Sequence, residues 1–189
     1  MASISELVGS DVHRRAKPWL VLGVALVLAA ALLPRVDPHW YWPGLIVSLS
    51  GMLARLWVLG SVRSRKLLPV NGPYRFVRNP GYIADFVFIF GLVLMAGDPT
   101  VFLFYIPIYV VYTLYRVSRD EEALDERFGA EYRRYCKEVP RFLPRLKPRG
   151  NGRTWYFNLK QFQRQYGEIF LVLSALLYAA CYVAAFHLD

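Results

Sequence analysis

Charged and aromatic residues collect in two stretches, 71–82 and 119–144, on either side of a pair of apolar segments. In the first stretch Arg78 stands directly before Asn79 and Pro80. A proline at the first position of a helix preforms its opening turn, and the free backbone N–H groups there favour an anion. A guanidinium beside such a turn suits a carboxylate ligand by charge and by paired hydrogen bonds. The alternative role for Arg78 is to anchor a helix start at a membrane surface.

The acidic pair Glu121 and Glu122 lies near the start of the second stretch. Two acids at the start of a helix complement its dipole and can simply form a solvated face. In a binding site they would recognise a cationic or hydroxyl-rich ligand, such as an ammonium group and a ribose. Tyrosines could line an adenine pocket, although isolated tyrosines are more often interface or core residues. Those in question are Tyr74, Tyr82, Tyr132 and Tyr135.

Three further charged residues lie inside or next to apolar segments. Arg55 and Asp85 fall within apolar segments, where a charge in lipid needs water or a partner. They could form a mutual ion pair, reach the membrane surface or face a cavity, and with Arg78 they are the candidate substrate contacts. Arg75 precedes the third apolar segment, and we interpret it as an interfacial anchor.

The motifs of common soluble enzymes are missing from the sequence. The histidines His13, His39 and His187 lie far apart, so no zinc site is predicted. There is no Gly-x-Ser-x-Gly elbow, Walker loop or Gly-x-Gly-x-x-Gly motif. We therefore expect neither a soluble dinucleotide-binding fold nor a catalytic metal.

The composition indicates a membrane protein. The chain has 189 residues, of which 56% are hydrophobic, and a formal net charge of +9. In a soluble chain that charge would suggest nucleic acid, a partner that we do not expect here. Membrane proteins keep Lys and Arg on their cytosolic side, which accounts for the excess. The two cysteines imply no disulfide framework.

Five apolar segments predict membrane-spanning helices. They cover residues 18–33, 43–60, 81–96, 99–115 and 169–186. The link between the third and fourth is so short that the two must form an antiparallel hairpin. Lys and Arg number three in the N-terminal tail, one in 34–40, five in 61–80, none in 97–100, twelve in 117–167 and none after the last span. This alternation predicts a cytosolic N-terminus, with both polar stretches on the cytosolic side.

The predicted fold class is an all-α integral membrane protein with about five transmembrane helices, in which residues 1–189 form a single membrane domain. Its cytosolic cofactor pocket would be formed by the loop before the third helix and the segment after the fourth. Residues 118–137 are expected to be helical, either as a new helix capped by Ser118 or as a continuation of the fourth span. Gly129 is expected to break this helix, and prolines after Val139 to force an extended segment.

Three regions follow from this division. Residues 71–144 form the predicted catalytic core. Residues 145–168 form a basic amphipathic linker, whose segment 155–165 suits a helix on an anionic membrane surface. Residues 169–186 form an additional C-terminal helix, expected to pack against the hairpin or against a second protomer, which would make a homodimer.

The two polar stretches and the hairpin between them resemble the isoprenylcysteine carboxyl methyltransferase family and its phospholipid methyltransferase relatives. The family pattern is Gly-x-Tyr-x-x-x-Arg-His-Pro-x-Tyr, a membrane hairpin, Glu-Glu-x-x-Leu with Phe-Gly-x-x-Tyr-x-x-Tyr, and Val-Pro-Arg-x-x-Pro. The corresponding residues are Gly72, Tyr74, Arg78-Asn79-Pro80, Tyr82, Glu121-Glu122, Leu124, Phe128-Gly129, Tyr132, Tyr135, Val139-Pro140-Arg141 and Pro144. They occur in the family's order and spacing.

The resemblance implies a membrane methyltransferase that binds S-adenosylmethionine on the cytosolic side. Its acceptor would be a lipophilic, membrane-embedded molecule, such as an isoprenylcysteine-like carboxylate or a membrane lipid, that enters from the bilayer. Arg78 and Tyr82 would be catalytic, with Arg78 near the acceptor and the transferring methyl group. The residues implied to bind the cofactor are Asn79, Pro80, Tyr82, Glu121, Glu122, Tyr132, Tyr135, Val139, Pro140, Arg141 and Pro144.

One position departs from the family pattern, because Asn79 replaces the family's histidine. Asparagine keeps a hydrogen-bond donor and an acceptor but cannot carry charge. Cofactor binding is compatible with this change, whereas a proton-transfer role at this position is not.

Two other functions fit the same residues. Membrane sterol and enone reductases share a similar C-terminal pattern and bind NADPH, although they are usually longer and have more spans. A non-enzymatic membrane scaffold of the same fold is the third possibility, with Asn79 as the sign of lost activity.

Overall fold

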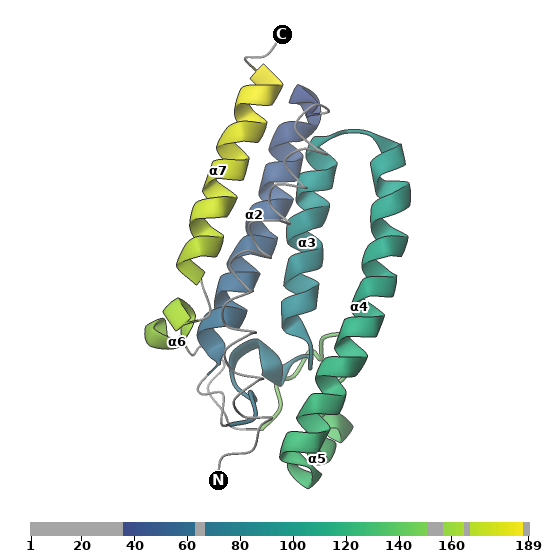
Figure 1. Cartoon of the computed structure of the whole chain (residues 1–189), viewed down its shortest axis with the longest axis vertical. Coiled ribbons are helices and arrows are strands. Elements are labelled where there is room, and N and C mark those ends of the chain that lie inside the picture. Colours follow the sequence, from purple (N-terminus) through teal and green to yellow (C-terminus); the bar gives the residue numbers. More distant parts are fainter. Residues whose placement is uncertain (1–35, 63–66, 151–156, 165–166, 187–189) are drawn as a thin grey trace, which may run out of the picture.

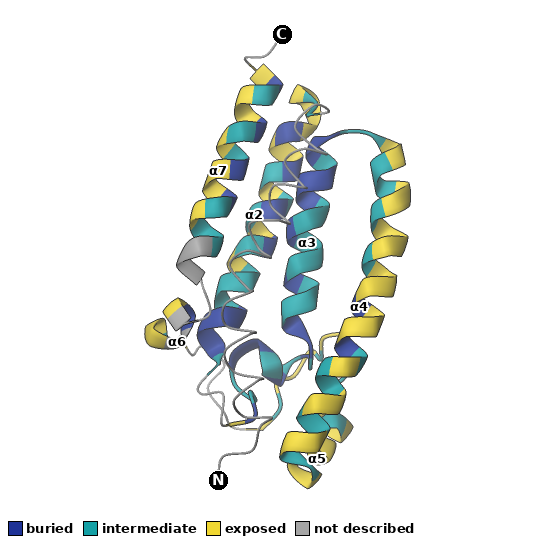
Figure 2. Ribbon diagram, viewed as in Figure 1, coloured by how far each residue is buried: buried dark blue, intermediate teal, exposed yellow. Residues whose placement is uncertain are grey.

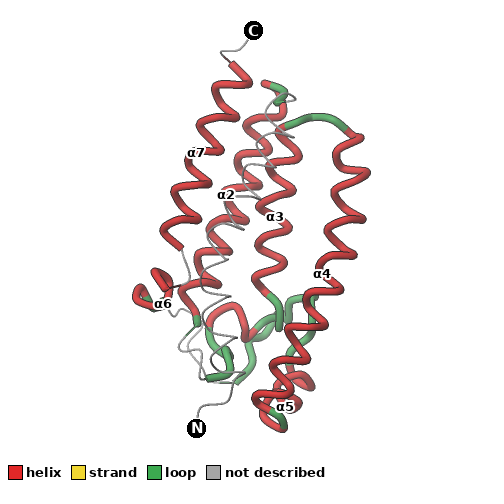
Figure 3. The backbone as a smooth tube through the Cα atoms, in the orientation of Figure 1, coloured by secondary structure: helices red, strands yellow, loops and turns green. Residues whose placement is uncertain are grey.

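All regular structure in the described part of the chain is helical (Figure 3). The computed structural model describes residues 36–62, 67–150, 157–164 and 167–186. The helices are α2 (Pro38–Ser61), the 3-10 helix η2 (Gly72–Arg75), α3 (Pro80–Met95), α4 (Pro99–Phe128), α5 (Ala130–Glu138), α6 (Leu159–Arg164) and α7 (Gly167–Phe186). Figure 1 shows α7, α2 and α3 side by side, with α4 beyond α3.

Four of the predicted spans correspond to long apolar helices. Segments 43–60, 81–96, 99–115 and 169–186 largely coincide with α2, α3, the first part of α4, and α7. The predicted span 18–33 lies outside the described residues. By length and composition, α2 and α4 can each cross a membrane, and α3 and Phe170–Phe186 are shorter apolar helices. These helices give the chain the character of a membrane protein.

The helices α2 and α3 pack at very close range because small residues lie between them. A Cβ atom on Gly51 would collide with the backbone of Phe88, and one on Gly91 would collide with Ser48. The Ser48 hydroxyl donates to the Phe88 carbonyl oxygen at 2.9 Å, and its oxygen lies 2.9 Å from the Tyr178 hydroxyl of α7. The close packing and the Ser48 contacts hold α3 against α2 and so fix the position of the first turn of α3.

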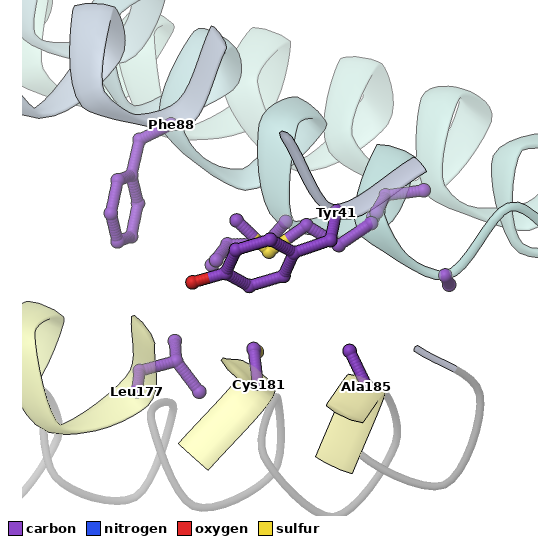
Figure 4. Packing of buried hydrophobic residues seen from close by; sticks show 9 residues of the cluster. Tyr41, Phe88, Leu177, Cys181 and Ala185 are labelled. Atoms are coloured by element: carbon purple, nitrogen blue, oxygen red, sulfur yellow. The ribbon is translucent and has the colours of Figure 1, made fainter. Parts of the chain in front are cut away.

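The C-terminal helix α7 packs within the chain. Its Leu177, Cys181 and Ala185 point toward Tyr41 of α2 and Phe88 of α3 (Figure 4), and all five belong to one buried cluster. The expected packing against the hairpin is thus present on its α3 side. A homodimer through α7 stays a prediction.

The hairpin of α3 and α4 is held by aromatic side chains. Phe86 stacks on Tyr105, with ring centroids 5.7 Å apart and planes 17° apart. The Tyr105 hydroxyl donates to the Phe86 carbonyl oxygen at 2.9 Å, and the Tyr109 hydroxyl donates to the Tyr82 carbonyl oxygen at 2.7 Å. The opposite face of α4 is exposed along most of its length (Figure 2).

After the apolar part, α4 runs on without a break to Phe128. Of the two alternatives predicted for Ser118, the continuous helix is the correct one. Gly129, with φ of 50°, separates α4 from α5, as predicted, because side chains rarely adopt that backbone conformation. Val139 then follows in an extended conformation, with φ of −119° and ψ of 122°.

Candidate functional site

The predicted site residues meet at the first turn of α3. Pro80 is the first residue of the helix and Asn79 its N-cap. An N-cap asparagine commonly accepts a bond from its own helix, but Asn79 makes no such bond. Its side-chain Nδ2 donates instead to Oε1 of Glu121 at 2.8 Å. This bond joins the start of α3 to α4 and links residues 42 positions apart.

Glu121 is the centre of the cluster. Its side chain is only 11% exposed, and Arg141 donates to its Oε2 through Nε at 3.0 Å and through Nη2 at 2.7 Å. Arg78 lies further away, with Nη1 3.6 Å from the same oxygen. A carboxylate with so little access to water requires partners of this kind. The hydrogen bond to Glu121 in turn raises the pKa of Arg141 above its ordinary value. Four residues that the sequence predicts separately thus form one contact network.

A segment that we call the strap, residues 139–150, crosses the first turn of α3 and the loop before it. Three main-chain hydrogen bonds hold it: Arg78 N donates to Pro140 O at 2.8 Å, Arg145 N to Phe76 O at 2.9 Å, and Arg149 N to Arg75 O at 3.0 Å. The strap begins at Val139, which is buried. It carries Arg141 to Glu121 and closes one side of the cluster.

Arg75 has a different role from the one predicted. Its residue is 4% exposed, so it is not an anchor in a membrane interface. Its Nε donates to the Arg149 carbonyl oxygen at 2.7 Å, and its Nη2 donates to the carbonyl oxygen of Gly150. Arg75 therefore fastens the far end of the strap.

The predicted tyrosines surround the cluster. The Tyr82 hydroxyl donates to Oδ2 of Asp120 at 2.6 Å, and the Tyr135 hydroxyl donates to the Tyr74 carbonyl oxygen at 2.7 Å. Tyr132 and Tyr135 are both buried. Burial is the main cause that raises the pKa of each of these two phenols, which keeps them neutral.

Two buried polar atoms of the cluster have no hydrogen-bond partner among the described residues. They are Nε of Arg78 and the hydroxyl oxygen of Tyr132. The thiol of Cys136 interacts with both side chains, but a thiol is a weak hydrogen-bonding group. An unmet donor of this kind is costly, so these atoms mark a place suited to a polar ligand.

Other predicted residues lie at the margin of the cluster. Glu122 and Pro144 are exposed. Arg55 and Asp85 form a mutual ion pair between α2 and α3, with Nε and Oδ1 3.1 Å apart, so the ion pair is the alternative that the structure supports. Each side chain of this pair keeps about a third of its surface exposed, at 29% and 31%.

Sequence reasoning missed three contributors. Asp120 accepts the Tyr82 hydroxyl, and Arg116 interacts with both of these residues. Cys136 follows Tyr132 by four residues on α5, so the two share a helix face. That spacing is a usable signal for Cys136, whereas nothing in the acidic run distinguishes Asp120 from its neighbours.

The region that contains this cluster matches a known family. The match is to the ergosterol biosynthesis ERG4/ERG24 family and covers residues 48–146, just over half of the chain. The chain belongs to the ERG4/ERG24 family. The matched region runs from α2 into the strap, so it includes Arg78, Asn79, Glu121 and Arg141 but not the last four residues of the strap.

Individual relatives of this ERG4/ERG24 chain carry different names. It is 28% identical to the nickel-cobalt-cadmium resistance protein NccN of Alcaligenes xylosoxydans xylosoxydans, over 76% of this chain and 73% of that one. It is 30% identical to the Delta(14)-sterol reductase LBR of Gallus gallus, over 47% of this chain and 14% of the reductase. It is 28% identical to the protein-S-isoprenylcysteine O-methyltransferase of Schizosaccharomyces pombe, over 46% and 37%. No solved structure matches the chain.

These matches refine the resemblance predicted from the motifs. A relationship to an isoprenylcysteine methyltransferase is present, but it is distant and partial. The family itself is ERG4/ERG24, and two Delta(14)-sterol reductases are among the relatives. The chain is therefore related to membrane enzymes of two chemistries, methyl transfer and reduction.

Proposed function

We propose that this protein is a membrane methyltransferase that uses S-adenosylmethionine to methylate a lipophilic acceptor, an isoprenylcysteine-like carboxylate or a lipid. The observation that carries the proposal is the network around Glu121. It brings together Arg78 and Arg141, which match the methyltransferase pattern, and Asn79, which replaces the histidine of that pattern.

The charge of the site supports this cofactor over a nicotinamide dinucleotide. Arg78 and Arg141 contact Glu121, and Arg116 interacts with Asp120, so cations and carboxylates are nearly balanced. NADPH carries several phosphate charges and would require an excess of cations, whereas S-adenosylmethionine is a zwitterion with one additional positive charge.

Two basic residues further along the strap are held by Glu138. Arg145 donates through Nη1 to the Glu138 carbonyl oxygen at 2.6 Å, and Arg149 donates through Nε to the Glu138 carboxylate. The hydrogen bond from Arg149 is the main cause that lowers the pKa of the Glu138 carboxyl, and the charge of Arg145 lowers it as well. Glu138 therefore stays ionised.

The residues present fit S-adenosylmethionine. A carboxylate of the ligand could accept from Nε of Arg78, and the Tyr132 hydroxyl could bond a ribose or adenine atom. Pro80, Tyr82 and Glu122 would complete the methionine and ribose end. Tyr135 and the strap residues Val139, Pro140, Arg141 and Pro144 would enclose the adenine.

The oxygens of Glu121 already have partners within the chain, which defines its role. We assign it the task of holding Arg78, Arg141 and Asn79 in place, so Glu121 is a positioning residue. Asn79 has no charge to gain or lose and takes no part in proton transfer.

When bound, S-adenosylmethionine supplies a methyl group already activated by its positive sulfur. A carboxylate acceptor then needs no general base. Arg78 orients the acceptor, and the strap together with α4 excludes water from both reactants. The ion pair of Arg55 and Asp85 provides polar contacts for the part of the acceptor that lies within the membrane.

Cofactor-dependent thermal stability tests the proposal. The full chain, purified in detergent, is heated alone and with S-adenosylhomocysteine, S-adenosylmethionine or NADPH. Stabilisation by the first two ligands, and not by NADPH, is the expected result, because ligands that bind the folded state raise its melting temperature.

The family match favours a second candidate, an NADPH-dependent sterol or enone reductase-like protein. Stabilisation by NADPH and by neither of the other two ligands would support the reductase function and refute the methyltransferase proposal. Stabilisation by none of the three ligands would point to a membrane scaffold without a cofactor.

A further inference from the structure

Two leucines of the strap are almost completely exposed. Leu143 is 81% exposed and Leu146 is 99% exposed, the highest values among the exposed large hydrophobic residues of the described chain. An isolated exposed leucine is common in proteins. Here the pair lies on a segment whose backbone is fixed on both sides of it, so the two side chains are displayed by the fold.

The strap is located at the membrane surface by its partners. It bonds to the residues before α3 and, through Arg141, to Glu121 of α4. Glu121 follows the apolar part of α4 by six residues, or about 9 Å along the helix axis. The headgroup layer on each side of a bilayer is roughly 6 Å thick, so Glu121 lies about 3 Å outside it and the strap borders this layer.

Other exposed basic and apolar side chains lie at the same end of the bundle as the two leucines (Figure 1). Lys147 follows Leu146 directly and is exposed. The exposed residues Phe157, just before α6, and Leu159 and Lys160, at its start, are at this end as well (Figure 1). Interleaved apolar and cationic side chains of this kind bind the interface of membranes that contain anionic lipids.

We propose that Leu143 and Leu146 insert into the adjacent leaflet, where Lys147 meets anionic headgroups, and that this docking holds the strap in place. Arg141 lies two residues before Leu143, so docking keeps its guanidinium on Glu121. The insertion follows from exposure, charge and position alone. Its coupling to cofactor affinity rests on the proposed function.

The depth of position 146 tests insertion directly. An environment-sensitive fluorophore is attached to Leu146→Cys in a chain whose Cys136 and Cys181 are alanine, reconstituted in phosphatidylcholine nanodiscs with or without phosphatidylglycerol. The matched control is Glu131→Cys, an exposed position of α5 beyond the end of α4. The proposal expects blue-shifted emission and quenching by headgroup-labelled lipid at position 146 only, stronger with phosphatidylglycerol. Identical emission and quenching at the two positions would overturn it.

A second measurement tests the coupling. Affinity for S-adenosylhomocysteine is compared between the wild-type chain, the Leu143→Ser/Leu146→Ser variant and the Leu143→Ile/Leu146→Ile variant in anionic nanodiscs. Because serine removes the apolar burial of both leucines, we expect binding at least about tenfold weaker for the serine variant and no change for the isoleucine variant. Equal affinity of the serine variant would refute the coupling.

The two failures are distinguishable. If the label at position 146 inserts but the wild-type chain binds no S-adenosylhomocysteine, the proposed function is rejected and the docking stands. If the wild-type chain binds S-adenosylhomocysteine but the label at position 146 stays in water, the docking is rejected and the proposed function stands.

Discussion

Replacing Glu121 by glutamine tests the polar network most sharply. The substitution keeps the size of the side chain and an oxygen for the Asn79 amide, but removes the charge that Arg141 and Arg78 face. Breaking a fully buried ion pair costs about 3–5 kcal/mol, and a hydrogen bond to a charged group contributes about 1.5–3 kcal/mol. Because the Arg141 side chain is 37% exposed and stays partly hydrated, we expect a loss of about 2–3 kcal/mol.

The neighbouring carboxylate provides the control. Glu122 is exposed, so Glu122→Gln should change the free energy of unfolding by less than about 0.5 kcal/mol. Both variants are unfolded chemically in mixed micelles, and a double-mutant cycle with Arg141→Gln isolates the pair. A coupling energy of about 1–2 kcal/mol is expected. Equal stabilities of the two glutamine variants, with no coupling, would refute the reasoning.

Three further predictions concern the supporting structure. Arg75→Gln should release the far end of the strap, so limited proteolysis within residues 139–150 should become faster than in Lys137→Gln, which alters an exposed side chain of α5 outside the strap. Gly91→Leu should separate α2 from α3 and cost at least about 1–3 kcal/mol, whereas Leu103→Ala on the exposed face of α4 should leave the melting temperature unchanged. The folded chain keeps the Tyr132 and Tyr135 phenols protonated above pH 10, the ordinary value at which unfolded tyrosines ionise, so stability should fall as pH rises past 10. Phenylalanine at both positions should flatten that decline, and an unchanged slope would contradict it.

Much of the fold can be predicted from the sequence because its signals are local. Apolar length predicts four of the described helices, and the linker predicts the hairpin, in which Asp98 caps α4 by accepting from Thr100 N at 2.8 Å. Pro80 and Gly129 act through their own backbone restrictions, so the helix start and the helix break follow from residue type.

Roles that depend on distant partners could not be predicted in this way. The Arg75 guanidinium bonds carbonyl groups 74 and 75 positions away, and no local pattern distinguishes it from a membrane anchor. Asn79 likewise leaves its own helix for a carboxylate on α4. A sequence reports which residues are polar, whereas the path of the strap decides which of them meet.

The difference between Glu121 and Glu122 depends on a distant partner, but a local pattern also indicates it. Glu121, Leu124 and Phe128 share one face of α4 at helical spacing, and all three are partly buried. Glu122 points about 100° away around the helix and is exposed. Helical periodicity alone could therefore have indicated Glu121 as the inward-facing acid.

Methyl transfer itself tests the central claim most directly. The reconstituted chain is incubated with S-adenosylmethionine labelled in its methyl group and a total membrane lipid extract, and the organic phase is counted and fractionated. We predict label in one lipophilic species with the wild-type chain, and a loss of at least tenfold with Arg78→Gln. No label above that of protein-free membranes, together with NADPH-dependent reduction of a lipid in the same extract, would contradict the account.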